Sequence, residues 1–310
     1  MPVVTHRCVD SEQAHQRLDN FLLRELKGVP RGHVYRLLRT GQVRVNGKRV
    51  KAEYRLQTGD DLRLPPVRQA DRELPRAPGS RQLERLRAAI LHEDAELLII
   101  NKPAGMPVHG GSGVSFGVIE MLRRLRPEEH ALDLVHRLDR DTSGCLVVAR
   151  KRSALRALHA AIRAGEVEKH YCALLAGVWR GGPREVTLAL QKNVLQSGER
   201  RVRVATGGKP SQTLFSPLQH YADASLMDVL IRSGRTHQIR VHAAALHHPV
   251  LGDDKYGDRD ANRRLRAHGL TRMFLHAARI AFVHPATGKR LEVSAPLEEA
   301  LEVVLGRLPR

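Results

Sequence analysis

The segment His136-Arg-Leu-Asp-Arg-Asp-Thr-Ser-Gly144 is a strongly polar loop between two short apolar runs, Leu132–Val135 and Cys145–Ala149. Apolar runs of this length, bounded by turn residues, are typical of buried strands. Between them two carboxylates alternate with arginines, and the arginines favour an ionised Asp139, which suits a nucleophile or a general base. An ordinary strand-connecting turn would use similar residues. Asp139 and Asp141 could also bind a divalent metal, although the interleaved arginines disfavour a cation beside them.

The region around this loop mixes strands and helices in no regular alternation. We expect strands at Ala95–Ile100, Tyr171–Val178 and Leu226–Ile231, and helices at Ser115–Arg126 and His237–His248. Ser153 is expected to cap a further helix. Because strands outnumber helices, the pattern predicts an α+β fold with a mixed, largely antiparallel sheet rather than a doubly wound sheet.

A smaller unit is expected upstream. Apolar residues recur at helical spacing from Gln16 to Lys27, and again in a second helix that Gly41 ends. Asn46-Gly47, flanked by alternating apolar residues, predicts a tight hairpin, and a last short strand follows at Leu62–Leu64. We therefore expect a small α/β unit at residues 1–66, a linker at 67–85, where Arg, Pro and acidic residues dominate, and a larger unit at 86–310.

The charge of the chain indicates a polyanionic partner. The 310 residues include 52 Lys and Arg against 33 Asp and Glu, a formal net charge of +19, and basic residues that neutralise phosphates release condensed counterions. A nucleic acid fits better than a membrane surface, since no lipidation signal, basic amphipathic helix or membrane-spanning stretch is evident. The three cysteines, Cys8, Cys145 and Cys172, are scattered, which favours a reducing cytoplasm over a disulfide framework or a zinc knuckle.

Two further clusters carry polar or aromatic side chains that chemistry could use. Ser233-Gly-Arg-Thr-His-Gln-Ile-Arg-Val-His242 follows a buried strand and opens a helix, a place where arginines bind phosphate, or where they form a solvated basic face. Its histidines, with His247 and His248, lack the HExxH spacing of a zinc site, so we expect no metal. Glu168-Lys-His-Tyr-Cys-Ala173 starts a strand, and its tyrosine is either a core residue or a surface on which a base stacks.

Together these motifs resemble one family. HRLDRDTSG (136–144), KHYCA (169–173) and GRTHQIRVH (234–242) resemble the ribosomal and transfer RNA pseudouridine synthases typified by RluA. The resemblance extends over nearly the whole chain through NKPAGMPVHGGSG (101–113), NVLQSGERRVRV (193–204), Gly252–Asp258 and FLHAARIAFVHPATG (274–288). The unit that contains VRVNGKRV (43–50) looks like an S4 RNA-binding domain.

The resemblance implies a pseudouridine synthase fold and the isomerisation of uridines of large-subunit (23S) ribosomal RNA. It places the nucleophilic aspartate at Asp139, and at Arg137 the arginine that fills the space left by the flipped base. It places the active-site tyrosine at Tyr171 and the arginine that pairs with the aspartate at Arg240. The reaction oxidises nothing and no group leaves the molecule, so we expect no cofactor. In the S4-like unit we expect RNA contacts from seven basic residues: Arg31, Arg36, Arg39, Arg44, Lys48, Arg49 and Lys51.

Two other functions fit part of the sequence. A pure RNA-binding S4 protein would explain the charge but not the Asp139 loop. An RNA hydrolase or base-removing glycosidase would use Asp139 together with Asp141. The sequence also leaves open whether Asp139 attacks ribose C1′ or uracil C6, or acts in a glycal route. We expect a cytoplasmic monomer.

Overall fold

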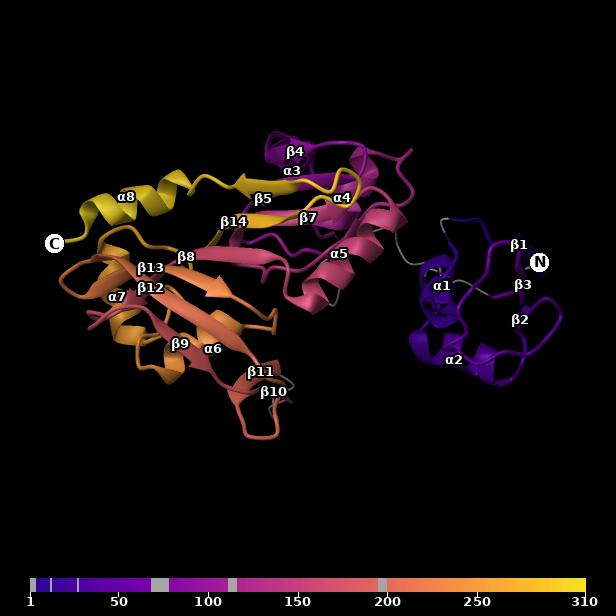
Figure 1. Cartoon of the computed structure of the whole chain (residues 1–310), viewed down its shortest axis with the longest axis horizontal. Coiled ribbons are helices and arrows are strands. Elements are labelled where there is room, and N and C mark those ends of the chain that lie inside the picture. Colours follow the sequence, from indigo (N-terminus) through magenta and orange to yellow (C-terminus); the bar gives the residue numbers. More distant parts are fainter. Residues whose placement is uncertain (1–3, 12, 27, 68–77, 111–115, 195–199) are drawn as a thin grey trace. The chain divides into compact units, whose positions relative to one another are not determined.

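The computed structural model describes residues 4–11, 13–26, 28–67, 78–110, 116–194 and 200–310. The chain divides into two compact units, Met1–Ala77 and Pro78–Arg310, which are drawn in Figure 1. Within the expected linker at residues 67–85, residues 68–77 lie outside the described part. The end of that range is not a linker, because helix α3 (Ser80–Ala88) begins inside it and packs against α4 (Val118–Leu125).

The first unit contains two helices and a small antiparallel sheet. The helices are α1 (Leu18–Glu25) and α2 (Arg31–Arg39), and the strands are β1 (Thr5–Cys8), β2 (Arg44–Val45) and β3 (Asp61–Leu64), in the order β1-β3-β2. The expected apolar faces of both helices are buried: Leu18, Leu22 and Val34 are fully inaccessible to solvent. Burial of these faces against the sheet stabilises helices that would be too short to persist alone.

The Asn46-Gly47 turn forms, but the hairpin expected around it does not continue. Asn46 and Gly47 have φ values of 50° and 74°, as a two-residue hairpin turn requires, and the N–H of Lys48 donates to the carbonyl of Val45 at 2.9 Å. Beyond this bridge, β2 pairs with β3, which sets Val45 opposite Leu62. Both side chains are buried, so the core selects this distant partner over the local one.

The second unit is organised around one large sheet. Its strands run in the order β4-β5-β7-β14-β8-β13-β12-β9, with β15 beside β14 and β6 beside β7. Their bounds are β4 (Ile90–Glu93), β5 (Leu97–Lys102), β6 (Asp133–Leu134), β7 (Ser143–Ala149), β8 (Glu168–Ala176), β9 (Arg184–Thr187), β12 (Gln212–His220), β13 (Ala224–Ile231), β14 (Leu275–Val283) and β15 (Arg290–Ser294).

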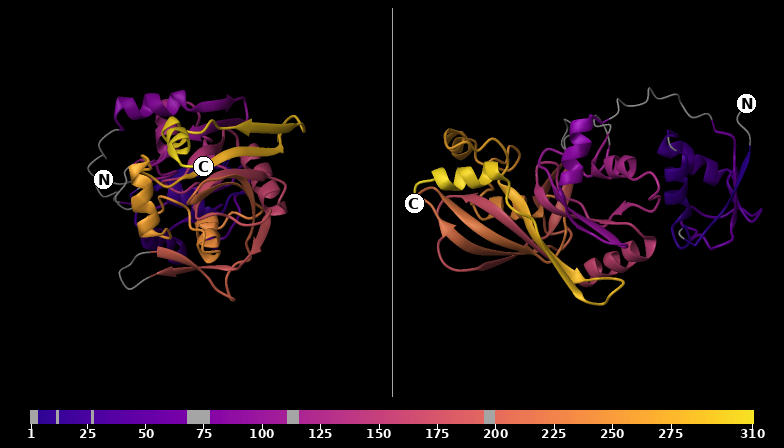
Figure 2. Two further views of the ribbon diagram at one scale, coloured as in Figure 1. Left: turned by 90° about the vertical axis from the view of Figure 1, so that its left-hand side faces the viewer. Right: turned by 90° about the horizontal axis from the view of Figure 1, so that it is seen from above.

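Among the described strand pairs of this sheet, β14 with β7 is parallel and the others are antiparallel. The expected α+β class with a mixed, largely antiparallel sheet is therefore confirmed. Figure 2 shows that the strands fan out across the sheet, as the twist between neighbouring strands requires. A separate two-stranded ribbon, β10 (Leu190–Val194) and β11 (Arg200–Val204), contacts helix α6 (Gln238–Ala245).

The remaining helices are α5 (Arg152–Ala164), α7 (Arg259–Ala267) and α8 (Glu299–Arg307). The expected capping of α5 by Ser153 is wrong, because the extended residue that precedes the helix is Lys151, and it provides no side-chain cap. Ser153 already has helical backbone, so its side chain cannot act as the N-cap. Helix α7 has a side-chain cap instead: Asp258 accepts the N–H of Ala261 at 2.7 Å.

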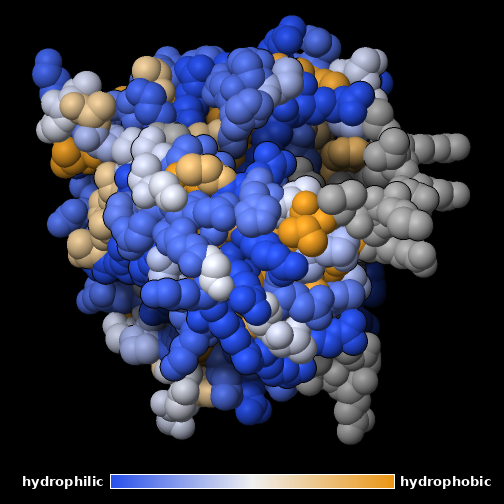
Figure 3. Space-filling model, turned by 90° about the vertical axis from the view of Figure 1, so that its right-hand side faces the viewer, coloured by the Kyte–Doolittle hydropathy of each residue, from blue (hydrophilic) through white to orange (hydrophobic). Residues whose placement is uncertain are grey.

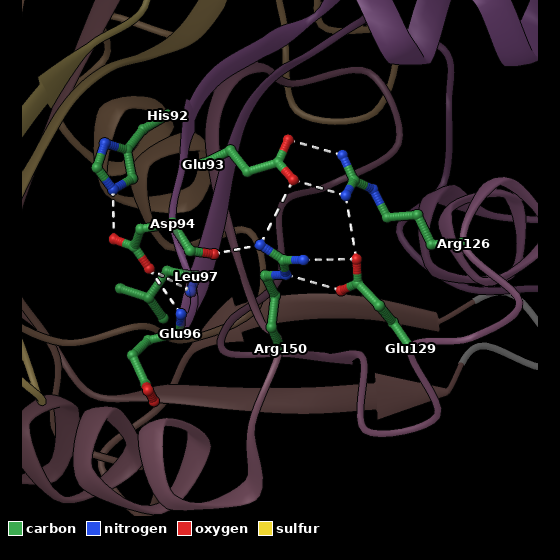
Figure 4. A network of polar contacts seen from close by, with 8 residues as sticks. All are labelled: His92, Glu93, Asp94, Glu96, Leu97, Arg126, Glu129 and Arg150. Carbon is green, nitrogen blue, oxygen red and sulfur yellow. Dashed lines mark hydrogen bonds and ion pairs between the residues drawn. The ribbon is translucent and has the colours of Figure 1, made fainter.

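A network of ion pairs connects the segments that precede and follow the polar loop (Figure 4). Arg126, after α4, contacts Glu93 at 2.6 Å and Glu129 at 3.0 Å. Arg150, after β7, contacts Glu129 at 2.8 Å. Because the two arginines and Glu129 are largely buried, these pairs restrain the segment before β6 and the end of β7 more than exposed pairs would.

The surface in Figure 3 is largely hydrophilic, with apolar side chains in small separate spots. Within the described residues, none of the helices has both the length and the apolar character needed to span a bilayer.

Candidate active site

The polar loop connects β6 to β7. The N–H of Thr142 donates to the carbonyl of Asp139 at 3.2 Å, which closes the turn. Gly144, the second residue of β7, has a φ of +107°, and a Cβ at this position would lie 2.3 Å from the carbonyl oxygen of Ala277. A glycine therefore lets β7 lie close to β14 and fixes where the loop ends.

Asp139 lies beside Arg240 of α6, although 101 positions separate them along the chain. The Nη1 atom of Arg240 donates to Oδ2 of Asp139 at 3.0 Å. On the other side, Nε and Nη2 of Arg240 donate to Oδ2 and Oδ1 of Asp253 at 2.7 and 2.8 Å. A guanidinium held by two carboxylates keeps a fixed orientation, so Asp139 has a well-placed partner. The structure thus brings together the two residues that the resemblance pairs.

Arg240 and Asp253 are both ionised in this arrangement. Burial acts to lower the pKa of Arg240, but the hydrogen bonds and charge of Asp253, and then the charge of Asp139, raise it above the ordinary value. Burial acts to raise the pKa of Asp253, yet the hydrogen bonds and charge of Arg240 outweigh it, and that pKa lies below the ordinary value. Arg240 is therefore a permanent positive charge next to Asp139.

The loop after Gly252 supplies residues that sequence reasoning did not assign to the site. Asp253 is fully buried, and its Oδ1 also accepts the backbone N–H groups of Lys255 and Tyr256 at 2.8 and 3.1 Å. The ring of Tyr256 lies 5.0 Å from the guanidinium of Arg240, a cation–π contact. In the sequence, Gly252–Asp258 stands out only through the resemblance; nothing in its composition indicates that it supports Arg240.

His237 is the second residue without a predicted role. It precedes α6 in a left-handed conformation, with a φ of 54°, which is unfavourable for a residue other than glycine and is found mainly where the surroundings impose it. Its Nδ1 lies 2.8 Å from the hydroxyl of Tyr256, and its Nε2 lies 3.8 Å from Oδ2 of Asp139. Burial lowers the pKa of His237, so this ring is mainly neutral at neutral pH.

Tyr171 lies in β8, opposite Val229 of β13, and is 6% exposed. It is a core residue, and it also lines the cavity that contains Asp139. Burial, and then the negative charge of Asp139, raise the pKa of Tyr171 above its ordinary value. Its hydroxyl therefore stays protonated, and within the described residues no hydrogen bond reaches it.

The cavity formed by Asp139, Tyr171, Arg240 and their neighbours has a volume of about 70 Å³. Sites for small ligands usually enclose about 300–1,000 Å³, so the space that Asp139 shares with Tyr171 is smaller than a nucleoside needs. Asp139 and Arg240 also line an adjoining hollow of about 520 Å³ on the side of Asp253, which is large enough. Arg137 lies at the cavity and is exposed. It can therefore change its position with little loss of packing.

Lys102, at the end of β5, supports the polar loop, a role that the sequence did not predict. Its side chain is fully buried, and Nζ donates to the carbonyl oxygens of Pro103, Met106 and Arg140 at 2.9, 2.9 and 3.0 Å. Burial lowers the pKa of Lys102 to about 7. The three hydrogen bonds connect the segment after β5 to the polar loop.

The structure separates the histidines that the sequence groups together. His242 lies 3.0 Å from the hydroxyl of Ser211, and Nδ1 of His248 lies 2.8 Å from the carbonyl of Ala176. In the part of the chain that the structure describes, no three His, Cys, Asp or Glu side chains are grouped so that they could hold a metal ion. Asp141 is exposed at the edge of the loop.

The seven basic residues predicted to contact RNA in the first unit are all exposed. Several contact carbonyl groups or a ring of the same unit: Arg44 donates to the carbonyls of Gly41 and Gly47, and Arg31 lies 5.6 Å from the ring of Tyr35. Within the described residues, none of the seven forms an ion pair with a carboxylate, so their charge is available to an external anion.

Comparison with known proteins is consistent with this geometry. A family model described as RNA pseudouridylate synthase matches residues 96–245, and a model of the S4 domain matches residues 16–62. The chain is 51% identical to the ribosomal large subunit pseudouridine synthase C of Escherichia coli (strain K12) over 310 residues, 99% of this chain and 97% of that protein. It is 52% identical to the protein of the same name in Pasteurella multocida (strain Pm70), over 97% and 92% of the two chains.

Among solved structures, human RNA pseudouridylate synthase domain containing 4 matches with a TM-score of 0.61 and 26% identity, over 74% of this chain and 97% of that chain. Identity above one half along almost the entire length confirms the family that the motifs indicate. The chain belongs to the RNA pseudouridine synthases, isomerases that convert uridine to pseudouridine.

Proposed function

We propose that this enzyme converts specific uridines of large-subunit ribosomal RNA to pseudouridine, with Asp139 as its nucleophile. The name of the Escherichia coli relative supports the substrate, and the S4 domain and the net charge of +19 support an RNA partner. One observation carries the choice of Asp139: its carboxylate lies 3.0 Å from Arg240, at a cavity that Tyr171 also lines.

The reaction that Asp139 must serve is a rearrangement within one nucleotide. The C1′–N1 bond breaks, the uracil turns, and C5 bonds to C1′, while C5 loses a proton and N1 gains one. Asp139 attacks ribose C1′ or uracil C6, or assists departure of the uracil in a glycal route, and each route needs a carboxylate at the same place. Arg240 would keep that carboxylate oriented and balance its charge.

The surrounding residues would admit and retain the base. The target nucleotide must leave its stack, because its glycosidic bond is inaccessible inside a helix. Arg137, exposed at the cavity, would fill the space that the base leaves. Tyr171 would stack on the uracil while it is detached, which prevents its loss by diffusion. The hydroxyl of Tyr171 is also a conduit for the C5 proton.

The two units would divide the work. The first unit would bind ribosomal RNA through its exposed basic residues, from Arg31 to Lys51, and the second unit would carry out the isomerisation. The chain would act as a monomer in the cytoplasm, where large-subunit RNA is synthesised and assembled.

The experiment that tests this function is incubation of the protein with unmodified large-subunit RNA, followed by mass measurement of the RNA and detection of pseudouridine. We expect pseudouridine at specific positions and an unchanged RNA mass. Loss of uracil or cleavage of the strand would instead indicate a glycosidase or a hydrolase. Binding without any change in the RNA would indicate an RNA-binding protein without this activity.

A further inference from the structure

A second hollow adjoins the cavity that contains Asp139. It is bounded by the ribbon β10–β11, by Gly207–Lys209 and by Gly234–Thr236, and these last three residues also line the Asp139 cavity. Its volume of about 390 Å³ falls within the range of about 300–1,000 Å³ that is usual for ligand sites. An occupant of this hollow would be a direct neighbour of the nucleotide in the Asp139 cavity.

The hollow has a strongly positive lining. Lys192, Lys209 and Arg235 face it and are exposed, and among the described residues that line it there is no Asp or Glu. Within the described residues, none of the three forms an ion pair. Because like charges that share one hollow repel one another, their gathering is unfavourable until an anion binds between them.

The backbone holds these cations in place. The N–H groups of Leu190 and Lys209 each donate to the carbonyl of the other, at 2.9 and 2.8 Å. A Cβ on Gly208 would lie 2.7 Å from the carbonyl carbon of Leu190, so this close approach requires a glycine. On the opposite side, Nε of Arg235 donates to the carbonyl of Pro210 at 3.1 Å, which leaves its two terminal nitrogens for another acceptor.

We propose that this hollow binds a phosphate of the RNA strand immediately beside the flipped uridine. This inference rests on the proposed function, since it takes the Asp139 cavity as the place of the target base. A strand whose base enters that cavity continues past residues 234–236, which the two spaces share. The forked guanidinium of Arg235 suits two phosphate oxygens, and the lysines supply point charges. Contacts of this kind fix the register of the nucleic acid without reading its sequence.

The first test compares charge removal in the hollow with charge removal elsewhere in the same unit. The variants are the double change Lys192→Gln/Lys209→Gln and the single change Arg235→Gln. Lys289→Gln, in the turn between β14 and β15, and Arg163→Gln, near the end of α5, are matched controls at exposed positions. The double change Lys192→Arg/Lys209→Arg keeps the charge. The dissociation constant of a short RNA with one target uridine is measured at several salt concentrations, together with the single-turnover rate at saturating RNA.

Removal of each protein–phosphate interaction should reduce the slope of log affinity against log salt by about 0.7 for a single strand. The glutamine variants should show this reduction, whereas the controls and the arginine variant should keep the slope. The Lys192→Gln/Lys209→Gln protein, whose changed residues do not line the Asp139 cavity, should also keep a near wild-type rate at saturation. Equal slopes for the glutamine variants and the controls would overturn the proposal. A reduced rate with an unchanged slope would overturn it as well.

The second test removes the charge from the RNA. A neutral methylphosphonate replaces the phosphate on the 5′ or the 3′ side of the target uridine. At one of these positions it should weaken binding to the wild-type protein much more than binding to the Lys192→Gln/Lys209→Gln protein. Additive effects at both positions would refute the interaction. If the wild-type protein forms no pseudouridine in the same short RNA with all its phosphates intact, the proposed function fails. If it does and only the coupling is absent, the phosphate site alone is wrong.

Discussion

Replacement of Asp253 by asparagine tests how Asp253 supports the ion pair between Arg240 and Asp139. The carboxylate of Asp253 is fully buried and accepts two hydrogen bonds from Arg240 and two from backbone N–H groups. Asparagine has a single acceptor oxygen, so its amide N–H₂ would face an N–H donor of Arg240. Removal of one partner of a buried ion pair costs about 3–5 kcal/mol. Because Arg240 keeps Asp139 as a partner, we expect the lower end, about 3 kcal/mol in the free energy of unfolding.

Urea unfolding followed by tryptophan fluorescence measures this loss within the second unit. Trp179 is the single tryptophan of the chain and is 2% exposed, so its emission reports on that unit. Asp254→Asn is the matched control, because Asp254 is the exposed neighbour, and surface changes usually stay within about 0.5 kcal/mol. In single-turnover assays Asp253→Asn should also slow the reaction on the order of 10–100-fold, because a loosened Arg240 misplaces Asp139.

The pH dependence of the stability loss shows whether it comes from the ion pair of Asp253 with Arg240 or from packing alone. The pKa of Asp253 lies below its ordinary value of 3.8 in the folded protein, because the hydrogen bonds and charge of Arg240 outweigh burial. Its contribution is therefore fully present above 3.8 and is lost as the pH falls through the folded pKa. The stability difference between the wild-type and Asp253→Asn proteins should shrink in that acid range. Equal stability of Asp253→Asn and Asp254→Asn at neutral pH, or a difference that does not change with acid, would refute this reasoning.

Three further results are expected. Tyr171→Leu should be severe if stacking of the ring matters, and Tyr171→Phe should retain binding but stall the reaction if the hydroxyl carries the proton; wild-type rates for both would make Tyr171 a core residue only. Activity should survive chelation with EDTA as long as the RNA stays folded, and specific rescue by a divalent ion at concentrations too low to refold RNA would contradict this. Truncation of residues 1–66 should weaken binding to long ribosomal RNA and lower the salt slope by about one unit for each phosphate that the protein no longer neutralises. Failure of the chemical step at saturating RNA in a folded truncation would place the first unit in the active site.

Local patterns predicted the parts of the fold that depend on local structure. Helix α2 ends just before Gly41, as expected, because Gly41 adopts a φ of 71° that a helix does not allow, and Pro30 precedes its first residue. The sequence did not predict which distant strands pair with each other. The Asn46-Gly47 turn is visible locally, but only the buried contact of Val45 with Leu62 shows that β2 pairs with β3. Helix α3 was missed because its sequence is mostly polar and it buries a single side chain completely, that of Leu86.

In the candidate active site, too, local motifs predicted some residues, and tertiary contacts alone revealed others. Asp139, Tyr171 and Arg240 lie in family motifs, so the resemblance alone identified them as candidate site residues. Asp253 contacts Arg240 through side chains that no periodicity brings together. Lys102 had no predicted role, since a lysine within an apolar strand gives no sign that three carbonyl groups will surround it. Supporting residues of this kind act through tertiary contacts, and only the folded chain identifies them.

Release of tritium from uridine C5 in ribosomal RNA measures the central reaction directly, because C5 loses its hydrogen when it bonds to C1′. Asp139→Asn keeps the size of the side chain but removes the carboxylate that we propose as the nucleophile, and Asp141→Asn is the matched control in the same loop. We expect release by the wild-type and Asp141→Asn proteins and none by Asp139→Asn, with equal RNA binding and equal Trp179 fluorescence for all three. Comparable release by Asp139→Asn, or a larger loss in Asp141→Asn, would contradict the assignment of Asp139 as the nucleophile.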